Sequence, residues 1–439
     1  MRYTNKTGRI ICFFCITTIV LAGCSSYVDL SNIEHLYQSE NYTQAYQSLE
    51  QRSNSLLQAQ GPIIVNYDLG LLARLDGRYQ DSNQFLSEAE RGIQEAYTQS
   101  ISANLASFLV NDNTKKYGGE EYEDLYLNTF KALNYLHLGR AEDALVEINR
   151  SLEKQAQLKN HYEQQMKQAS GFAVEKGLDT DTEQTYASSF STSALSNYLG
   201  SIIADGLGET NTRDFALQQV RHAFASQPDL YPFKLPRLVE QASQNPTSAR
   251  LHLVSFNGMA PKKEERRESV FLSPGNHSVI AYPVLVGRPS RVKAVQVTVS
   301  QGPTIFLEKL ESISAIAIDT FQAKSSLIYL KATLRAMAKA IGVAAYDAIA
   351  EQDEQVTATE QFFSFLFHVA QDVTESADIR STHFLPAEAW VGYVDLAPGT
   401  YTVTISFLDG YNQSIGNKVF SKVDIQKGQT NLLESFCPY

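Results

Sequence analysis

Cys24 is the residue of this chain best placed for covalent chemistry, because a thiol is a strong nucleophile. It follows Leu21-Ala22-Gly23, which closes an apolar run over residues 10–20 behind a basic head formed by Arg2, Lys6 and Arg9. That run is far shorter than the ~20 residues that a helix needs to cross a bilayer. The arrangement is typical of a secretory signal, so we expect residues 1–23 to be removed.

The tetrapeptide Leu21-Ala22-Gly23-Cys24 resembles the lipobox of bacterial lipoproteins. The resemblance implies that the Cys24 sulfur takes a diacylglycerol, that the signal is cut before it, and that the new amino group receives a further chain such as palmitate. Two or more acyl chains hold a protein stably on a membrane. Ser25 and Ser26 follow, where an Asp would tend to retain the protein at the inner membrane. The resemblance therefore implies an outer-membrane lipoprotein facing the periplasm of a diderm host.

Few other residues suggest chemistry. Cys12 and Cys15 lie in the signal, which leaves Cys437 without a disulfide partner, and we interpret it as an inert thiol rather than an intermolecular bridge. The sequence contains no HExxH, GxSxG, P-loop or glycine-rich dinucleotide motif. The histidines are scattered singly: His35, His137, His161, His222, His252, His277, His368 and His383. We therefore expect no enzyme, no metal site and no cofactor.

The charge of the chain disfavours two classes of partner. The formal net charge is −11, and loss of the three basic residues of the signal would make it −14. An acidic protein is a poor ligand for nucleic acid or for an anionic membrane surface. The hydrophobic fraction of 43% is enough for a core without disulfides. We expect a globular protein tethered by its lipid, with no nucleic-acid partner.

The first part of the chain, residues 24–230, has the spacing of a tetratricopeptide-like solenoid. That repeat places a small residue twelve positions before a second one, followed by apolar and small residues four and seven further on. Three sets fit, the last with four extra residues between its helices, and Ile33, Ala45 and Leu49 form a partial fourth. The full sets are Gly70/Ser82/Leu86/Ala89, Ala132/Ala144/Ile148/Ser151 and Gly200/Ala216/Val220/Ala223. Stacked repeats of this kind leave a groove that holds a partner's peptide or helix.

After a linker at 231–249, the pattern changes from helix to strand over residues 250–439. Short alternating runs, among them residues 388–396 and 400–408, are separated by turn signals such as Asn257-Gly258 and Pro398-Gly399. This pattern predicts an antiparallel β-sandwich-like domain, with Lys262–Glu268 as a charged loop. Residues 396–407 resemble the last hairpin of small carbohydrate-associated or PEGA-type β modules. The overall fold class is therefore α+β.

A helical pair interrupts the strands at about 310–381. Ile328, Leu334 and Ile341 recur at helical spacing, and Lys331, Arg335 and Lys339 line another face. We expect this helix to cover one face of a sheet; a basic helix on a membrane surface is the alternative. The second member is the apolar run 362–370, which we expect to be buried between that helix and the sheet.

Several features together resemble a family of tetratricopeptide-containing bacterial outer-membrane lipoproteins without an established activity. They are the lipobox, the repeats, Asn257-Gly258 with Pro261-Lys262, the alanine-rich helix, and the motifs at 377–381 and 385–388. The resemblance covers nearly all of the chain after the signal. Within those motifs, Asp378, Arg380 and Glu388 are candidates for interdomain ion pairs between helix and sheet.

These observations predict a lipid-anchored periplasmic scaffold or adaptor. It would bind an unidentified protein of the cell envelope through its helical-repeat groove, with a role in cell-envelope assembly. One alternative is a glycan- or peptidoglycan-binding lipoprotein that acts through the β domain. A hydrolase with a nonstandard site is the other.

Overall fold

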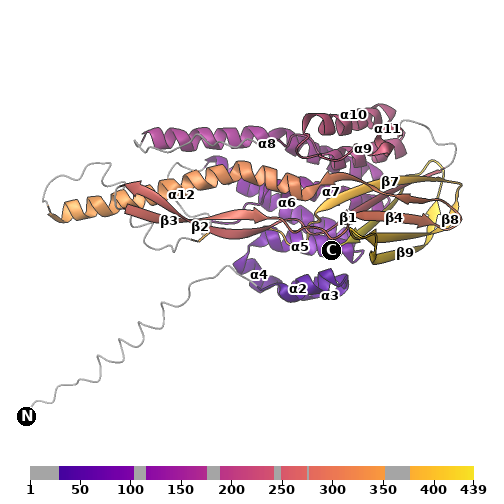
Figure 1. Cartoon of the computed structure of the whole chain (residues 1–439), viewed down its shortest axis with the longest axis horizontal. Helices are drawn as coiled ribbons and strands as arrows, with labels where there is room; N and C mark the ends of the chain where they lie inside the picture. Colours follow the sequence, from indigo (N-terminus) through magenta and orange to yellow (C-terminus); the bar gives the residue numbers. More distant parts are fainter. Residues whose placement is uncertain (1–28, 103–114, 176–187, 242–248, 274–275, 352–375) are drawn as a thin grey trace, which may run out of the picture.

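The computed structural model describes residues 29–102, 115–175, 188–241, 249–273, 276–351 and 376–439. Over these residues the fold is α+β, with helices first, strands second, and one long helix between the strands (Figure 1). Cys24 with its signal and the apolar run 362–370 lie outside the described residues. The helices before the strands are α2 (Ser31–Gln38), α3 (Tyr42–Gln51), α4 (Ser53–Ala59), α5 (Pro62–Leu75), α6 (Tyr79–Ser102), α7 (Glu121–His137), α8 (Ala141–Glu175), α9 (Ala194–Gly206), α10 (Thr210–Ser226) and α11 (Arg237–Gln241).

Four turns between these helices share one hydrogen-bonding pattern. After α5, the Gly77 N–H donates to the Arg74 carbonyl at 3.0 Å, and the Arg78 N–H donates to the Ala73 carbonyl at 2.8 Å. Gly77 has a φ of +78°, a left-handed conformation that favours glycine at the end of a helix. The same pair of bonds and a positive φ close the turns after α2, α7 and α9, at Glu40 (+58°), Gly139 (+71°) and Gly208 (+76°).

The small residues of the repeat pattern lie where consecutive helices touch. A Cβ on Gly70 of α5 would lie 2.7 Å from Leu86 Cγ of α6, so only glycine allows this approach. The Ser82 hydroxyl donates to the Gly70 carbonyl at 2.7 Å across the same contact. α5 packs on α6, α7 on α8, and α9 on α10, in chain order. Sequence spacing therefore identified real helix-to-helix contacts in this half.

The second half forms two four-stranded sheets and one hairpin. One sheet has the order β10-β1-β7-β6, the other has the order β5-β4-β8-β9, and β2 pairs only with β3. The strands are β1 (Ala249–Asn257), β2 (Lys262–Ser273), β3 (Asn276–Val286), β4 (Ala294–Val299), β5 (Thr304–Phe306), β6 (Glu308–Ser312), β7 (Glu388–Leu396), β8 (Gly399–Leu408), β9 (Ser414–Ile425) and β10 (Asn431–Cys437).

Three local predictions were wrong. Lys262–Glu268 is not a loop but the start of β2, which within the described part of the chain pairs with β3 alone and leaves its other edge to charged side chains. The sheet is not purely antiparallel, since β10 runs parallel to β1. β10 follows a strand of the other sheet, so no tight hairpin dictates its direction. The sequence also predicts a loop over residues 171–185, but α8 continues to Glu175, past Gly171.

The largest hydrophobic core is shared by the two halves of the molecule. It contains side chains from α2, α5, α7 and α9 together with Val254 and Phe256 of β1, Val391 of β7 and Phe384. A second core lies between the two four-stranded sheets and includes Val297 and Ile405. The helices α2, α5, α7 and α9 therefore pack directly against the sheet that contains β1.

The long helix α12 (Ile313–Glu351) and the hairpin β2–β3 project together from the body, and we call them the arm (Figure 1). Ile280 and Tyr282 of β3 pack on Ala332 and Ala336 of α12. This packing agrees with the prediction that the alanine-rich helix covers strands. Among the described residues, no helix has both the length and the apolar character needed to cross a bilayer.

Candidate functional site

The inner side chains of the helical repeats contact the chain's own sheet and not solvent. We call this contact the seam. The Tyr126 hydroxyl of α7 donates to Glu311 of β6 at 2.7 Å, and the Tyr198 hydroxyl of α9 lies 3.1 Å from His252 Nδ1 of β1. The Tyr37 hydroxyl of α2 donates to the Phe384 carbonyl at 3.1 Å. The sequence predicts that a partner's peptide binds in a groove on this inner side of the helices. In the structure, strands and the segment 376–387 cover that side.

Glu311 is a buried carboxylate at the centre of the seam. It accepts hydrogen bonds from Tyr126, from the Ser193 hydroxyl at 2.9 Å, from the Tyr231 hydroxyl at 2.8 Å, and from the Leu195 N–H at 3.1 Å. All of these donors are uncharged. Burial raises the pKa of Glu311 above its ordinary value, although the hydrogen bonds act in the opposite direction. Hydrogen bonds from uncharged donors to Glu311 therefore connect α7, α9 and Tyr231 to β6.

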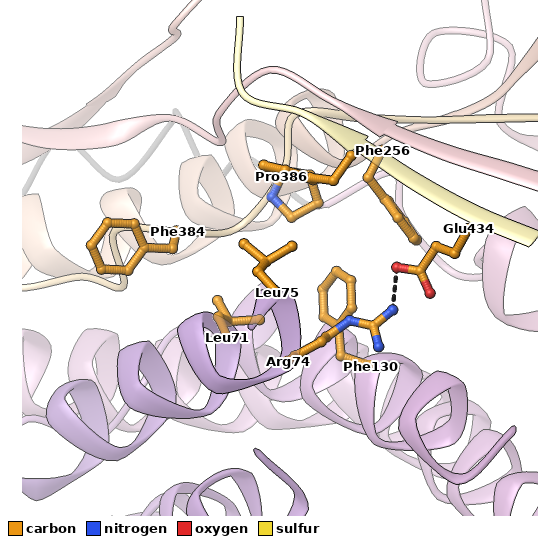
Figure 2. Close-up of a pocket in the computed structure, with 9 residues that line it drawn as sticks. Leu71, Arg74, Leu75, Phe130, Phe256, Phe384, Pro386 and Glu434 are labelled. Atoms are coloured by element: carbon orange, nitrogen blue, oxygen red, sulfur yellow. Dashed lines mark hydrogen bonds and ion pairs between the residues drawn. The ribbon is translucent and has the colours of Figure 1, made fainter. Parts of the chain in front are cut away.

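A small pocket opens along the seam beside β10 (Figure 2). Arg74 points from α5 to Glu434 of β10 and forms a buried ion pair with it. Burial opposes ionisation of Glu434, but Arg74 and His137 lower its pKa to about 2. The remaining walls are apolar. The lining residues are Leu71, Arg74, Leu75, Phe130, Phe256, Phe384, Pro386, Glu434 and Phe436.

Asp68 and His383 form a further polar contact across the seam. The His383 N–H donates to Asp68 Oδ1 at 2.9 Å, and His383 Nδ1 lies 2.6 Å from Asp68 Oδ2. Burial favours the neutral imidazole, but the charge of Asp68 outweighs it and raises the pKa of His383. Arg288 donates to the His383 carbonyl at 3.2 Å. The pair holds the segment before β7 against α5.

The base of the arm is held by a buried charged cluster, which we call the arm joint. Glu120, the N-cap residue of α7, forms ion pairs with Lys263 of β2 and with Lys324 of α12. Burial opposes its ionisation, but the two lysines lower the pKa of Glu120. Glu123, one turn later, accepts hydrogen bonds from the Tyr117 hydroxyl at 2.6 Å and from the Thr382 N–H at 2.8 Å. The arm joint thus ties α7, the hairpin, α12 and the segment 376–387 together.

The structure separates the three candidate residues for interdomain ion pairs. Arg380 pairs with Asp378, two residues away, with Nε and Oδ1 2.7 Å apart. Its guanidinium also donates to the Lys115 carbonyl at 2.8 Å, beside the arm joint. Glu388 lies elsewhere, on β7, and pairs with Lys309 of β6 at 2.7 Å. Arg380 therefore reaches the helical half through a carbonyl, and the Glu388 pair lies within one sheet.

The remaining chemically capable residues do not assemble into a reactive site in the described part of the chain. Burial raises the pKa of the Cys437 thiol to about 11 and lowers the pKa of His252 to about 4. No group of three side chains that could bind a metal ion occurs among the described residues.

Sequence reasoning did not identify Glu311 or the arm joint. Glu311 follows Leu310 in a run that alternates only briefly, and Lys263 lies in a charged stretch that is typical of a loop. A carboxylate directly after the apolar Leu310, near the end of a strand, was the only signal for Glu311. The pairing of Glu120 with Lys263 spans 143 positions, so no local pattern could reveal it.

Comparisons with known proteins leave the family open. No protein-family model, no curated protein and no solved structure matches this chain. Its function must therefore be argued from its own residues.

Proposed function

We propose that this protein is a lipid-anchored scaffold of the bacterial outer membrane, a tetratricopeptide-containing lipoprotein modified on Cys24, that binds a protein of the cell envelope. The lipobox-like tetrapeptide and its preceding apolar run support the anchor and the periplasmic location. The repeated turns at Gly77, Gly139 and Gly208 support a tetratricopeptide-like solenoid for the helical half. The two facing sheets support a β-sandwich-like second half with its helical insertion.

The arm carries this proposal. It extends α12 and β2–β3 away from the body, and the buried ions of the arm joint fix its base to α7. Val279 on β3 is 50% exposed and Tyr329 on α12 is 38% exposed, so the arm presents apolar side chains to a partner. An enzyme would need a reactive cluster, whereas a scaffold needs a rigid exposed extension. We therefore propose binding rather than catalysis as its role.

Because the chain's own sheet covers the inner face of the described repeats, we place the partner on the outward helices and the arm instead of in the groove. Phe215 of α10 is 60% exposed and Val146 of α8 is 50% exposed. Single exposed apolar residues are common on soluble proteins, so these positions are starting points for a test and do not define a patch.

Site-specific photo-crosslinking in cells tests the proposal. Probes at Val279, Tyr329, Phe215 and Val146 should give discrete protein adducts, whereas a probe at Tyr411, 87% exposed on the β8–β9 turn, serves as the control. A Val279→Lys substitution should abolish the adduct at Tyr329 if the arm is the docking surface. Adducts only at Tyr411, or none at any position, would contradict the scaffold function.

The anchor needs its own experiment, because a scaffold could bind its partner without lipid. Mass spectrometry of the processed protein should find Cys24 as the first residue, bearing diacylglycerol and an N-acyl chain. The Cys24→Ser variant should move from the membrane to the soluble fraction. An unmodified Cys24 in a membrane-bound protein would refute this mode of attachment.

A further inference from the structure

The connection between Cys24 and the folded body is short, and we call it the tether. Only four residues separate Cys24 from Asp29, the first residue that the structure describes. An extended chain spans at most ~3.5 Å per residue, so Asp29 lies no more than ~17 Å from Cys24. A folded chain of this size has a radius of gyration of about 22 Å. The tether is therefore shorter than the body is wide, and the body cannot turn over on it.

The chain is fixed to the body as soon as it reaches Asp29. The Ser31 N–H donates to Asp29 Oδ1 at 2.9 Å, and the Arg52 guanidinium donates to the Asp29 carbonyl at 2.9 Å. Leu30 is 4% exposed and belongs to the large core that the helices share with the sheet. Arg52 is the N-cap residue of α4. The tether therefore ends at the start of α2 and beside the start of α4, and the chain gains no further reach beyond Asp29.

The helices next to the tether differ in charge. α2, α3 and α4 lie along one edge of the molecule, and α8 and α10 lie along the opposite edge (Figure 1). α2 contains Glu34 and α3 contains Glu50, whereas residues 53–67, which include all of α4, contain no charged side chain. α4 is therefore the helix of this edge that can approach an anionic surface with the least repulsion.

The outer side of α4 combines one apolar side chain with small polar ones. Leu56 is buried in the core, whereas Leu57 is 38% exposed. The other exposed residues of the helix are Asn54, Ser55 and Gln58, which are uncharged. Such a surface suits the boundary between lipid headgroups and water. A helix of seven residues offers too little apolar area to bind a membrane by itself, so the acyl chains must supply the affinity.

We propose that the tether holds α4 against the headgroup surface of the membrane in which Cys24 is anchored, with α8 and α10 on the side that faces away. This inference rests on the proposed lipid anchor at Cys24. Acyl chains lie in the hydrocarbon, and the headgroup layer above it is about 5–8 Å thick. A reach of ~17 Å from the acylated residue therefore keeps the edge that carries Asp29 and α4 next to that layer.

Another protein fits between α4 and the membrane less well. Even a domain of about 100 residues has a radius of gyration of about 13 Å, so it is wider than the space that the tether leaves. Phe215 of α10 and Val146 of α8 lie instead on helices of the far edge. The proposed orientation therefore leaves these two positions open to a protein that approaches from the periplasm.

Fluorescence quenching in vesicles tests the orientation. The acylated full chain carries a fluorophore on Leu57→Cys or, as the matched control, on Phe215→Cys, which also replaces an exposed apolar residue of a helix. Cys437 is buried and Cys24 is acylated, so the label reaches only the introduced thiol. The vesicles contain phosphatidylethanolamine and phosphatidylglycerol with a nitroxide quencher on their headgroups. Because this layer is thin, quenching should be about fivefold stronger at position 57 than at position 215.

Lengthening the tether tests its part in the orientation. An insertion of about 20 glycine and serine residues after Ser26 adds a flexible linker with an end-to-end distance of about 25 Å. The acidic body can then move away from the anionic lipid, so quenching at position 57 should fall to roughly half. Unchanged quenching in this variant would overturn the tether as the cause of the orientation.

Mass spectrometry of the same samples separates this inference from the proposed anchor, and circular dichroism should show that each variant is folded. An unacylated Cys24 would overturn both proposals. Acylated protein that is quenched equally at positions 57 and 215 would overturn the orientation alone. A label at position 57 that neither the headgroup nitroxide nor aqueous iodide quenches would show that protein covers α4, which also overturns the orientation.

Discussion

Glu120 in the arm joint and Glu311 in the seam are both buried carboxylates, yet their environments are opposite. Glu120 has two lysine partners, and these lower its pKa. Glu311 has only hydroxyl and N–H donors, and burial raises its pKa. The comparison teaches that two lysines hold the arm at Glu120, whereas only uncharged donors hold the helices at Glu311, although a buried ion pair between Arg74 and Glu434 lies elsewhere in the seam. Removal of each carboxylate should therefore have different consequences.

The largest effect is expected for Glu120→Gln. The substitution keeps the shape but leaves Lys263, only 7% exposed, without its counter-charge. An unpaired buried charge of this kind costs about 3–5 kcal/mol of stability. Urea unfolding of the variant should show this loss. As a control, Glu264→Gln breaks an exposed pair with Lys262 and should change stability by less than about 1 kcal/mol. Equal losses for the two variants would mean that the arm joint is not electrostatic.

Asp68→Asn should have an intermediate effect on stability. Its partner His383 can become neutral by losing a proton, so no charge need remain buried without a partner. Removing a hydrogen bond to a charged group costs about 1.5–3 kcal/mol. The raised pKa of His383 means that this contribution is fully present below the unfolded histidine pKa and is lost as pH rises through the folded pKa. Chemical unfolding at pH 5 and pH 9 should show a larger loss at pH 5. A loss that is the same at both pH values would exclude His383 as the charged partner.

Glu311→Gln should lower the free energy of unfolding by less than Asp68→Asn does, about 1 kcal/mol at neutral pH. The amide can still accept hydrogen bonds from part of the donor set, and no cation is left without a partner. Differential scanning calorimetry of the variant beside Glu120→Gln would rank the two sites. A loss as large as that of Glu120→Gln would show that the neutral donors stabilise a carboxylate as strongly as two lysines do.

The smallest expected effect is the pH dependence, below neutrality, of the stability losses caused by Glu120→Gln and Glu311→Gln. It is also the sharpest test of the contrast between the two sites. Because the pKa of Glu120 is lowered, its contribution is present above the unfolded pKa and disappears as pH falls through the folded pKa. Because the pKa of Glu311 is raised, its contribution is present below the unfolded pKa and falls as pH rises through the folded pKa. The Glu120→Gln loss should therefore shrink in acid and the Glu311→Gln loss should grow, as measured by unfolding between pH 3 and pH 7. Parallel trends would refute the contrast.

Much of the fold could be predicted from local patterns. The spacing of Gly70, Ser82 and Leu86 predicted a contact between two helices because helical periodicity brings such residues to one face. Alternation predicted the strands at 388–396 and 400–408, which are β7 and β8. Lys262–Glu268 was misread because charged residues on a strand with a free edge resemble a loop in sequence. The parallel direction of β10 has no local signal.

The candidate site was largely beyond sequence reasoning. Arg380 and Asp378 were chosen from a motif, and they do lie beside the arm joint, but the residues that make that joint were not chosen. Glu120, Lys263 and Lys324 come from three distant segments. No spacing rule links such residues, because their meeting depends on how the arm folds back on α7.

The sequence by itself determined the elements and their order, since helix periodicity, strand alternation and turn glycines act over a few residues. It also carried the lipobox-like tetrapeptide. Only the tertiary structure decided that the repeats bury their inner face against the chain's own sheet, and that Glu120 meets lysines while Glu311 meets hydroxyls. The reason is physical: burial and ion pairing depend on which surfaces are brought together in space, and a local pattern contains no information about its distant neighbour.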